Sequence, residues 1–121
     1  MASLSTHVLD AALGRPAAAL TVRLDAAAAH GWSALADGRT DPDGRVREAF
    51  GGVELHPFRS GAAHEGRYRL VFDTAGYFAR RGVTDFFYPE VAVCFTVGDA
   101  AAHYHVPLLL SPFAYSTYRG S

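Results

Sequence analysis

The chain carries almost no net charge and has a single cysteine. Its 11 Lys and Arg residues nearly balance 12 Asp and Glu residues, which gives a formal net charge of −1. Nucleic-acid-binding domains usually carry a basic face, and no basic run occurs here, so we expect no nucleic-acid partner. One cysteine cannot form a disulfide within the chain, so the hydrophobic core must hold the fold.

Long apolar segments are also missing. No run approaches the ~20 residues needed to cross a bilayer. The N-terminus has neither the basic nor the apolar stretch of a signal peptide. The last three residues, Arg119-Gly120-Ser121, differ from the peroxisomal Ser-Lys-Leu signal. We therefore expect a cytoplasmic protein that does not bind membranes.

Absent motifs narrow the chemistry further. The chain has no Gly-x-Ser-x-Gly turn, which presents the nucleophile of many serine hydrolases. It has neither a Gly-x-Gly-x-x-Gly fingerprint nor a Walker loop, so we expect no bound dinucleotide or nucleotide phosphate. Cys94 lies in the apolar segment 91–97, with no cationic neighbour in the sequence to activate it. We expect it to be a small, buried, inert side chain.

The composition is that of a globular protein. Half of the residues are apolar and 19% are charged, and a length of 121 residues predicts one domain, residues 1–121. Turn-forming residues recur at short intervals between apolar or alternating runs, which favours an antiparallel β-sandwich. The predicted strands are 4–10, 20–26, 31–36, 45–50, 53–57, 65–73, 89–98, 103–110 and 114–119.

One short helix is predicted after residue 74. Asp73 or Thr74 can cap its start, and residues 75–81 form about two turns before Gly82 ends it. Tyr77 and Arg81 are four residues apart and should share a face of this helix.

His7 lies in the first predicted strand. Side chains alternate along a strand, so His7 shares a face with Ser5 and Leu9. Thr6 and Val8 lie on the opposite face. If that face packs into the core, His7 faces away from it. On this pattern alone, a solvent-facing histidine is the simpler interpretation.

Arg45 follows a turn signal, Asp43-Gly44. It could pair loosely with Asp41 or Asp43 in a surface ion pair worth less than ~1 kcal/mol. Alternatively, its planar guanidinium could grip the flat polar edge of a ring substrate. Arg47 lies two residues further on, on the same predicted face, and could take the same role.

The strand predicted near the C-terminus carries two histidines on one face. His103 and His105 alternate with Tyr104 and Val106, which share the opposite face. A His-x-His pair has metal-ligand spacing, and with His7 nearby it could form a three-histidine zinc site. Because no carboxylate or cysteine ligand lies in a matching motif, we predict no native metal.

The chain ends in Tyr118-Arg119-Gly120-Ser121. This could be an ordinary last strand with Tyr118 in the core. Alternatively, Tyr118 lines a pocket and Ser121 presents its hydroxyl or terminal carboxylate to it. Gly120 would then let the backbone approach the site closely, because it has no Cβ.

Together these segments resemble the 5-hydroxyisourate hydrolase family, the transthyretin-related enzymes of urate breakdown. The resemblance rests on motifs in matching order: Leu4-Ser5-Thr6-His7-Val8-Leu9-Asp10, Gly14-Arg15-Pro16-Ala17, Thr40-Asp41-Pro42-Asp43-Gly44-Arg45, Tyr88-Pro89-Glu90-Val91, His103-Tyr104-His105-Val106-Pro107, and the terminal Tyr118-Arg119-Gly120-Ser121. It runs from Leu4 to Ser121 and is less distinct between Gly51 and Glu65.

The resemblance implies an all-β, transthyretin-like fold with two four-stranded antiparallel sheets and one short helix. It also implies hydrolysis of 5-hydroxyisourate to 2-oxo-4-hydroxy-4-carboxy-5-ureidoimidazoline, without a metal or other cofactor. His7, Arg45, His105 and Ser121 would be the catalytic residues. Tyr118 would join the first three of these in binding the substrate. Which histidine acts as the general base is left open.

The resemblance further implies a homotetramer, a dimer of dimers, with sites near subunit interfaces. His7 and His105 would then face a central channel, and the segments 108–110 and 113–118 would supply much of the interface. Transthyretin, which carries a thyroid hormone, has lysine at the position of His7 and threonine at that of His105. These two differences favour the hydrolase, and a non-enzymatic carrier of a small ligand is the alternative function.

Overall fold

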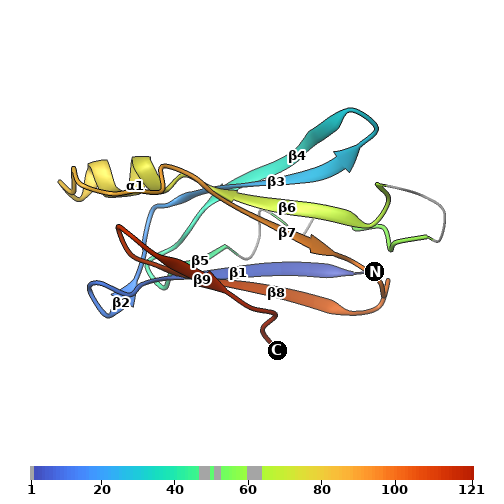
Figure 1. Ribbon diagram of the computed structural model, residues 1–121. Coiled ribbons are helices and arrows are strands. Elements are labelled where there is room, and N and C mark those ends of the chain that lie inside the picture. Colours follow the sequence, from blue (N-terminus) through green and yellow to red (C-terminus); the bar gives the residue numbers. More distant parts are fainter. Residues whose placement is uncertain (1, 47–49, 51–52, 60–63) are drawn as a thin grey trace.

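Two β-sheets pack face to face in the computed structural model (Figure 1), which describes residues 2–46, 50, 53–59 and 64–121. One sheet contains β1 (Ser3–Asp10), β2 (Arg15–Pro16), β5 (Arg45–Val46), β8 (His103–Leu110) and β9 (Tyr115–Thr117). The other contains β3 (Thr21–Ala28), β4 (Gly31–Arg39), β6 (Arg67–Phe72) and β7 (Val91–Thr96). The helix α1 (Thr74–Arg80) lies at the end of the sandwich away from the N-terminus.

This arrangement confirms the predicted β-sandwich with a short helix. Within the described residues, the first sheet has five strands rather than four, because β1 pairs with β2 near Asp10 and with β5 near His7. One pairing also departs from the antiparallel expectation, since β1 and β8 run parallel from Ser3–His103 to Asp10–Leu110. These two strands are far apart in the sequence, so no tight turn forces them to run in opposite directions.

Alternating side chains of the two sheets fill a shared core. Thr6 and Val8 of β1 are fully buried, as predicted, and the hydroxyl of Thr6 donates to the carbonyl of Val106 at 2.6 Å. Fully buried side chains of the opposing sheet include Leu24 and Phe72, and burial of each such side chain contributes about 1.5–3 kcal/mol. Because these positions take the inner faces, the intervening residues of β1 and β8 face outward.

Two predicted strands differ from the observed ones. The prediction of a strand at 53–57 is wrong, since only Leu55 pairs there, in an isolated bridge with Ala2. The backbone N–H of His56 donates instead to the hydroxyl of Tyr68 at 2.7 Å, and Pro57 has no N–H for a ladder. Of the strand predicted at 45–50, only Arg45–Val46 is observed, as β5, and Phe50 lies in a turn. Positions 47–49, including Arg47, lie outside the described residues.

The helix lies within one residue of its predicted bounds. Asp73 caps it, with Oδ1 accepting from the backbone N–H of Gly76 at 3.0 Å. The guanidinium of Arg81 lies 5.7 Å from the ring centroid of Tyr77, which confirms their shared face. In the part of the chain that the structure describes, no helix is long and apolar enough to cross a membrane.

A buried carboxylate ties the end of β1 to the helix. Asp10 has no exposed surface and accepts from the hydroxyl of Tyr77 at 2.7 Å and from Arg81 Nη1 at 2.9 Å. It also accepts from two backbone N–H groups of the following turn, each at 3.0 Å. Burial, followed by the hydrogen bond to Asp10, raises the pKa of Tyr77 to about 12, so the hydroxyl remains a donor. These bonds help to fix the end of the strand that carries His7.

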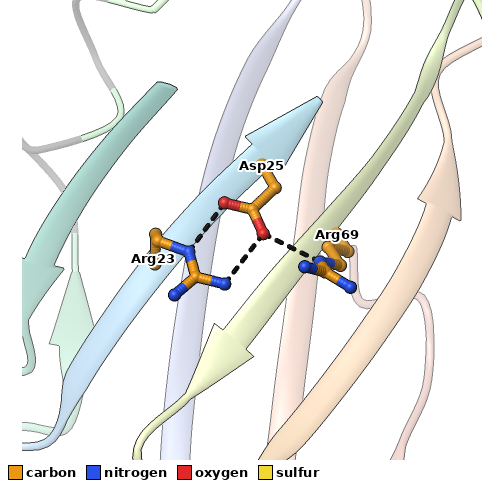
Figure 2. Close-up of polar contacts among 3 residues, drawn as sticks. All are labelled: Arg23, Asp25 and Arg69. Carbon is orange, nitrogen blue, oxygen red and sulfur yellow. Dashed lines mark hydrogen bonds and ion pairs between the residues drawn. The ribbon is translucent and has the colours of Figure 1, made fainter. Parts of the chain in front are cut away.

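The outer face of the second sheet carries an ion-pair network (Figure 2). Asp25 on β3 is 1% exposed and accepts from Arg23 Nε at 2.7 Å and from Arg69 Nε at 2.8 Å. The hydrogen bond from Arg23 is the main cause that holds the pKa of Asp25 below its ordinary value. Arg69 also lies over the ring of Trp32, 4.5 Å from its centroid. The network links three strands and lies on the opposite sheet from His7.

The prediction that Cys94 is buried is wrong. It is exposed on β7, where Val91, Val93 and Phe95 face inward and the positions between them face outward. The apolar character of the segment obscured the alternation, which is what decides the facing of each residue in a strand.

Candidate active site

A polar cluster forms on the outward face of β1, β5 and β8. The residue pairs Ser3–His103, Ser5–His105 and His7–Pro107 lie side by side across β1 and β8. On the other side of β1, His7 pairs with Arg45 of β5. Residues directly opposite one another in a sheet share a face. His7, Arg45 and His105 are therefore brought together, and the predicted outward facing of both histidines is confirmed.

The turn before β5 places Arg45. The carboxylate of Asp41 accepts from the backbone N–H groups of Asp43 and Arg45, each at 2.9 Å. Gly44 has a φ of +78°, and a Cβ there would lie 2.4 Å from the carbonyl oxygen of Val8 and 3.3 Å from His7 Cδ2. Only glycine fits both the conformation and the space. The turn thus packs against His7 and delivers Arg45 beside it.

A chain of hydrogen bonds links two serines and two histidines. Ser3 Oγ lies 2.5 Å from His103 Nδ1, and Ser5 Oγ lies 2.8 Å from His103 Nε2. Ser5 Oγ also lies 2.8 Å from His105 Nδ1. The sequence pattern placed Ser5 and His7 on one face but assigned no role to the serines. Their signal was the alternation Ser3-x-Ser5-x-His7 opposite His103-x-His105.

The environment of His105 lowers its pKa below the ordinary value. Burial is the largest cause, because it disfavours the charged ring, and the positive charge of Arg45 is the next. His103 and His7 act in the same direction. His105 is therefore neutral near pH 7 and retains a ring nitrogen that can accept a proton, as a general base requires.

The C-terminal segment reaches this cluster through Gly120. Its N–H donates to the carbonyl oxygen of His105 at 2.9 Å, and a Cβ at this position would lie 2.5 Å from His105 Cδ2. The close backbone approach expected of Gly120 is confirmed. Ser121 is exposed, and it makes no hydrogen bond to His7, Arg45 or His105 among the described residues.

Tyr118 lies at the edge of the sandwich. Its side chain is 60% exposed, so it is not a core residue. It lines a hollow of ≈ 270 Å³ together with Cys94 of β7 and Tyr104 of β8. Arg119 covers this region, with its guanidinium 4.7 Å from the ring centroid of Tyr104. In this chain Tyr118 is thus placed beside the cluster and not within it.

The geometry gives no support to the three-histidine zinc site. Within the described residues, no three His, Cys, Asp or Glu side chains form a group that could hold a metal ion. The serine hydroxyls engage both ring nitrogens of His103 and Nδ1 of His105. A metal ion bound by this pair would have to displace those hydrogen bonds.

Comparison with known proteins places the chain among hydrolases. Residues 4–120 match the HIUase/Transthyretin family. The chain is 44% identical over 118 residues to a protein of Salmonella dublin named 5-hydroxyisourate hydrolase. That match covers 98% of this chain and 80% of the Salmonella protein.

Two solved structures share the fold. The 5-hydroxyisourate hydrolase of Klebsiella pneumoniae matches with a TM-score of 0.76 and 35% identity, over 98% of this chain and 99% of that one. Sea bream transthyretin in complex with thyroxine matches with a TM-score of 0.83 and 31% identity, over 98% and 94%. The overall likeness therefore does not separate enzyme from carrier, and that distinction depends on the side chains of the β1–β8 face. The match over nearly the whole length shows that the chain belongs to the HIUase/Transthyretin family.

Proposed function

We propose that the chain hydrolyses 5-hydroxyisourate, the unstable product of urate oxidation, to 2-oxo-4-hydroxy-4-carboxy-5-ureidoimidazoline. The relatives named for this activity support the substrate. The observation that carries the proposal is the position of His105. It is a half-buried histidine with a lowered pKa, beside His7 and Arg45 on one sheet face.

In the proposed reaction, His105 takes a proton from water as the water attacks a carbonyl carbon of the six-membered ring. Arg45 binds the flat polar edge of the substrate and stabilises the negative charge that develops on the carbonyl oxygen. His7 and Ser121 orient the attacking water, and Tyr118, which lies beside the cluster, forms the rim of the substrate pocket. The reaction uses side chains alone and involves no metal or other cofactor.

We also propose that the enzyme is a homotetramer, a dimer of dimers, whose sites lie near subunit interfaces. Exposed aromatic side chains support an interface at one edge, since Phe113 is 60%, Tyr115 41% and Phe87 70% exposed. The expectation that segment 108–110 contributes strongly needs correction, because Leu108 and Leu110 are fully buried within one chain. The interface would therefore draw on segment 113–118.

Residues 1–121 would form a single domain, which is supported by the shared core of the two sheets and by the family match over residues 4–120. We place the enzyme in the cytoplasm, where an exposed free thiol such as Cys94 stays reduced. Neither a nucleic acid nor a membrane is expected as a partner. Fractionation of cells that express the native chain tests the compartment.

The alternative function is transport of a small ligand without catalysis. The likeness to a thyroxine-bound transthyretin favours it. His7, Arg45 and His105 favour the hydrolase, because they supply a proton acceptor and a cation that ligand transport does not need.

One experiment separates the two functions. Urate and urate oxidase generate 5-hydroxyisourate in a cuvette, and its decay is followed by absorbance with and without this protein. The hydrolase predicts decay that accelerates in proportion to protein concentration. Decay at the spontaneous rate, together with stoichiometric thyroxine binding by calorimetry, would establish the carrier instead.

A further inference from the structure

The serine–histidine chain extends from the candidate base to solvent. His105 is half-buried, whereas Ser3 and His103 are exposed. Ser5 stands between the two histidines, 2.8 Å from His105 Nδ1 and 2.8 Å from His103 Nε2. Both distances are those of direct hydrogen bonds, so the hydroxyl of Ser5 bonds both rings at once.

A serine hydroxyl has one proton to donate, and this couples the two rings. If Ser5 donates to His103, it must accept from His105, whose proton then lies on Nδ1. His105 Nε2 is then free to accept a proton. If Ser5 donates to His105, that ring carries its proton on Nε2 and has no free nitrogen. The direction of the hydrogen bonds through Ser5 thus decides whether His105 can act as a base.

We infer that Ser5 is a positioning residue that holds His105 in the tautomer with a proton on Nδ1, and that His103 orients the hydroxyl of Ser5. This inference rests on the proposed function. When both histidines are neutral, His105 Nδ1–H donates to Ser5 Oγ, and the hydroxyl of Ser5 donates to His103 Nε2. His103 Nδ1–H then donates to Ser3 Oγ. This direction leaves Nε2 free, as the proposed role of His105 as a general base requires.

The proton balance of the reaction preserves this tautomer. As the bond from the water oxygen to the ring carbon forms, one proton of the water moves to His105 Nε2. As the bond from carbon to ring nitrogen breaks, that proton moves from Nε2 to the leaving nitrogen. The Nδ1 proton stays with His105 throughout, and Ser5 accepts a stronger hydrogen bond while the ring is charged.

Ring-nitrogen NMR of the substrate-free protein tests the tautomer directly. Long-range ¹H–¹⁵N spectra of histidine-labelled protein at pH 8 should place the His105 proton on Nδ1. Ser5→Ala should shift it wholly or partly to Nε2, Ser5→Thr should restore it to Nδ1, and Ser33→Ala, an exposed control on β4, should change nothing. A His105 proton on Nε2 in the wild type, or one unmoved by Ser5→Ala, would overturn the inference.

Kinetics provide a second readout. Ser5→Ala should lower kcat about 10- to 100-fold with little change in KM, as expected when a partner that orients a functional histidine is lost. Ser5→Thr should recover most of this loss. His103→Ala should lower kcat by a smaller factor than Ser5→Ala, and an unchanged kcat would contradict the orienting role of His103. If the wild type does not hydrolyse the substrate, the proposed function fails while the NMR result still decides the tautomer.

Discussion

Gly120 lies directly against the imidazole of His105. Its N–H donates to the carbonyl oxygen of His105 at 2.9 Å, and a Cβ on Gly120 would come within 2.5 Å of Cδ2 and 3.2 Å of Cγ of that ring. The terminal segment thus forms one wall of the space around the candidate base. The role of Gly120 in this wall is steric, so adding a single methyl group at this position tests it.

Gly120→Ala should lower turnover by about 100-fold, because the ring of His105 must move to make room and a displacement of about 1 Å can cost that much. The coupled decay assay measures the loss. Gly98→Ala is the matched control, since a Cβ there meets no atom within 4 Å and the backbone is not left-handed. Equal turnover in both variants would show that the ring tolerates the methyl group and that the contact is irrelevant.

Arg45→Gln should raise the pKa of His105 toward its ordinary value, because it removes the largest charge effect on that ring. NMR titration of the His105 ring measures this, with Arg39→Gln on β4 as a control. The pKa of wild-type His105 lies below its ordinary value of about 6.5, so its ring stays neutral somewhat below that pH. The ring in Arg45→Gln should become charged at a higher pH than the wild-type ring. Because the folded ring holds its proton less tightly than the unfolded one, its contribution to stability falls as pH drops through about 6.5. A His105 pKa that falls in Arg45→Gln would contradict the account.

Turnover should survive dialysis against a strong chelator, because the proposed chemistry uses side chains alone. The decay assay is run before and after dialysis, with metal content measured in both samples. Loss of activity that zinc restores would favour the site formed by His7, His103 and His105.

Asp25→Ala should destabilise the fold by about 2 kcal/mol, since it removes charged hydrogen bonds and leaves two arginines without their shared partner. Glu65→Ala is the control, because the exposed Arg59–Glu65 pair should contribute less than ~1 kcal/mol. Urea unfolding measures both. The lowered pKa of Asp25 means that its contribution is present near neutral pH and is lost as pH falls through that pKa. A difference between the variants that persists unchanged in strong acid would argue against the ion pairs.

Alternation in the sequence predicted the facing of the site strands well. Thr6 and Val8 are buried, so His7 had to face outward, and the same argument holds for Tyr104, Val106 and His105. Local chemistry also placed the helix, since Asp73 and Gly82 bound it as expected. These features depend on neighbours in the sequence, which a pattern can capture.

Features that depend on long-range pairing were not predicted. The parallel pairing of β1 with β8 aligns Ser5 with His105, and no local pattern specifies that register. The role of Ser5 therefore emerged only from the structure. The strand expected at 53–57 failed for a similar reason, because Tyr68 takes the N–H of His56 that a ladder would need. Cys94 was misplaced because apolar composition outweighed alternation in the interpretation.

Turnover by four single-alanine variants tests the central claim most directly, namely that the β1–β8 face is a hydrolytic site. His7→Ala, Arg45→Ala and His105→Ala should each lose at least ~100-fold in kcat, because acid–base and charge-stabilising groups contribute about that much. His103→Ala should be milder, and all four should keep the wild-type mass in light scattering. An inactive His103→Ala beside an active His105→Ala would contradict the account, as would wild-type turnover in the other three variants.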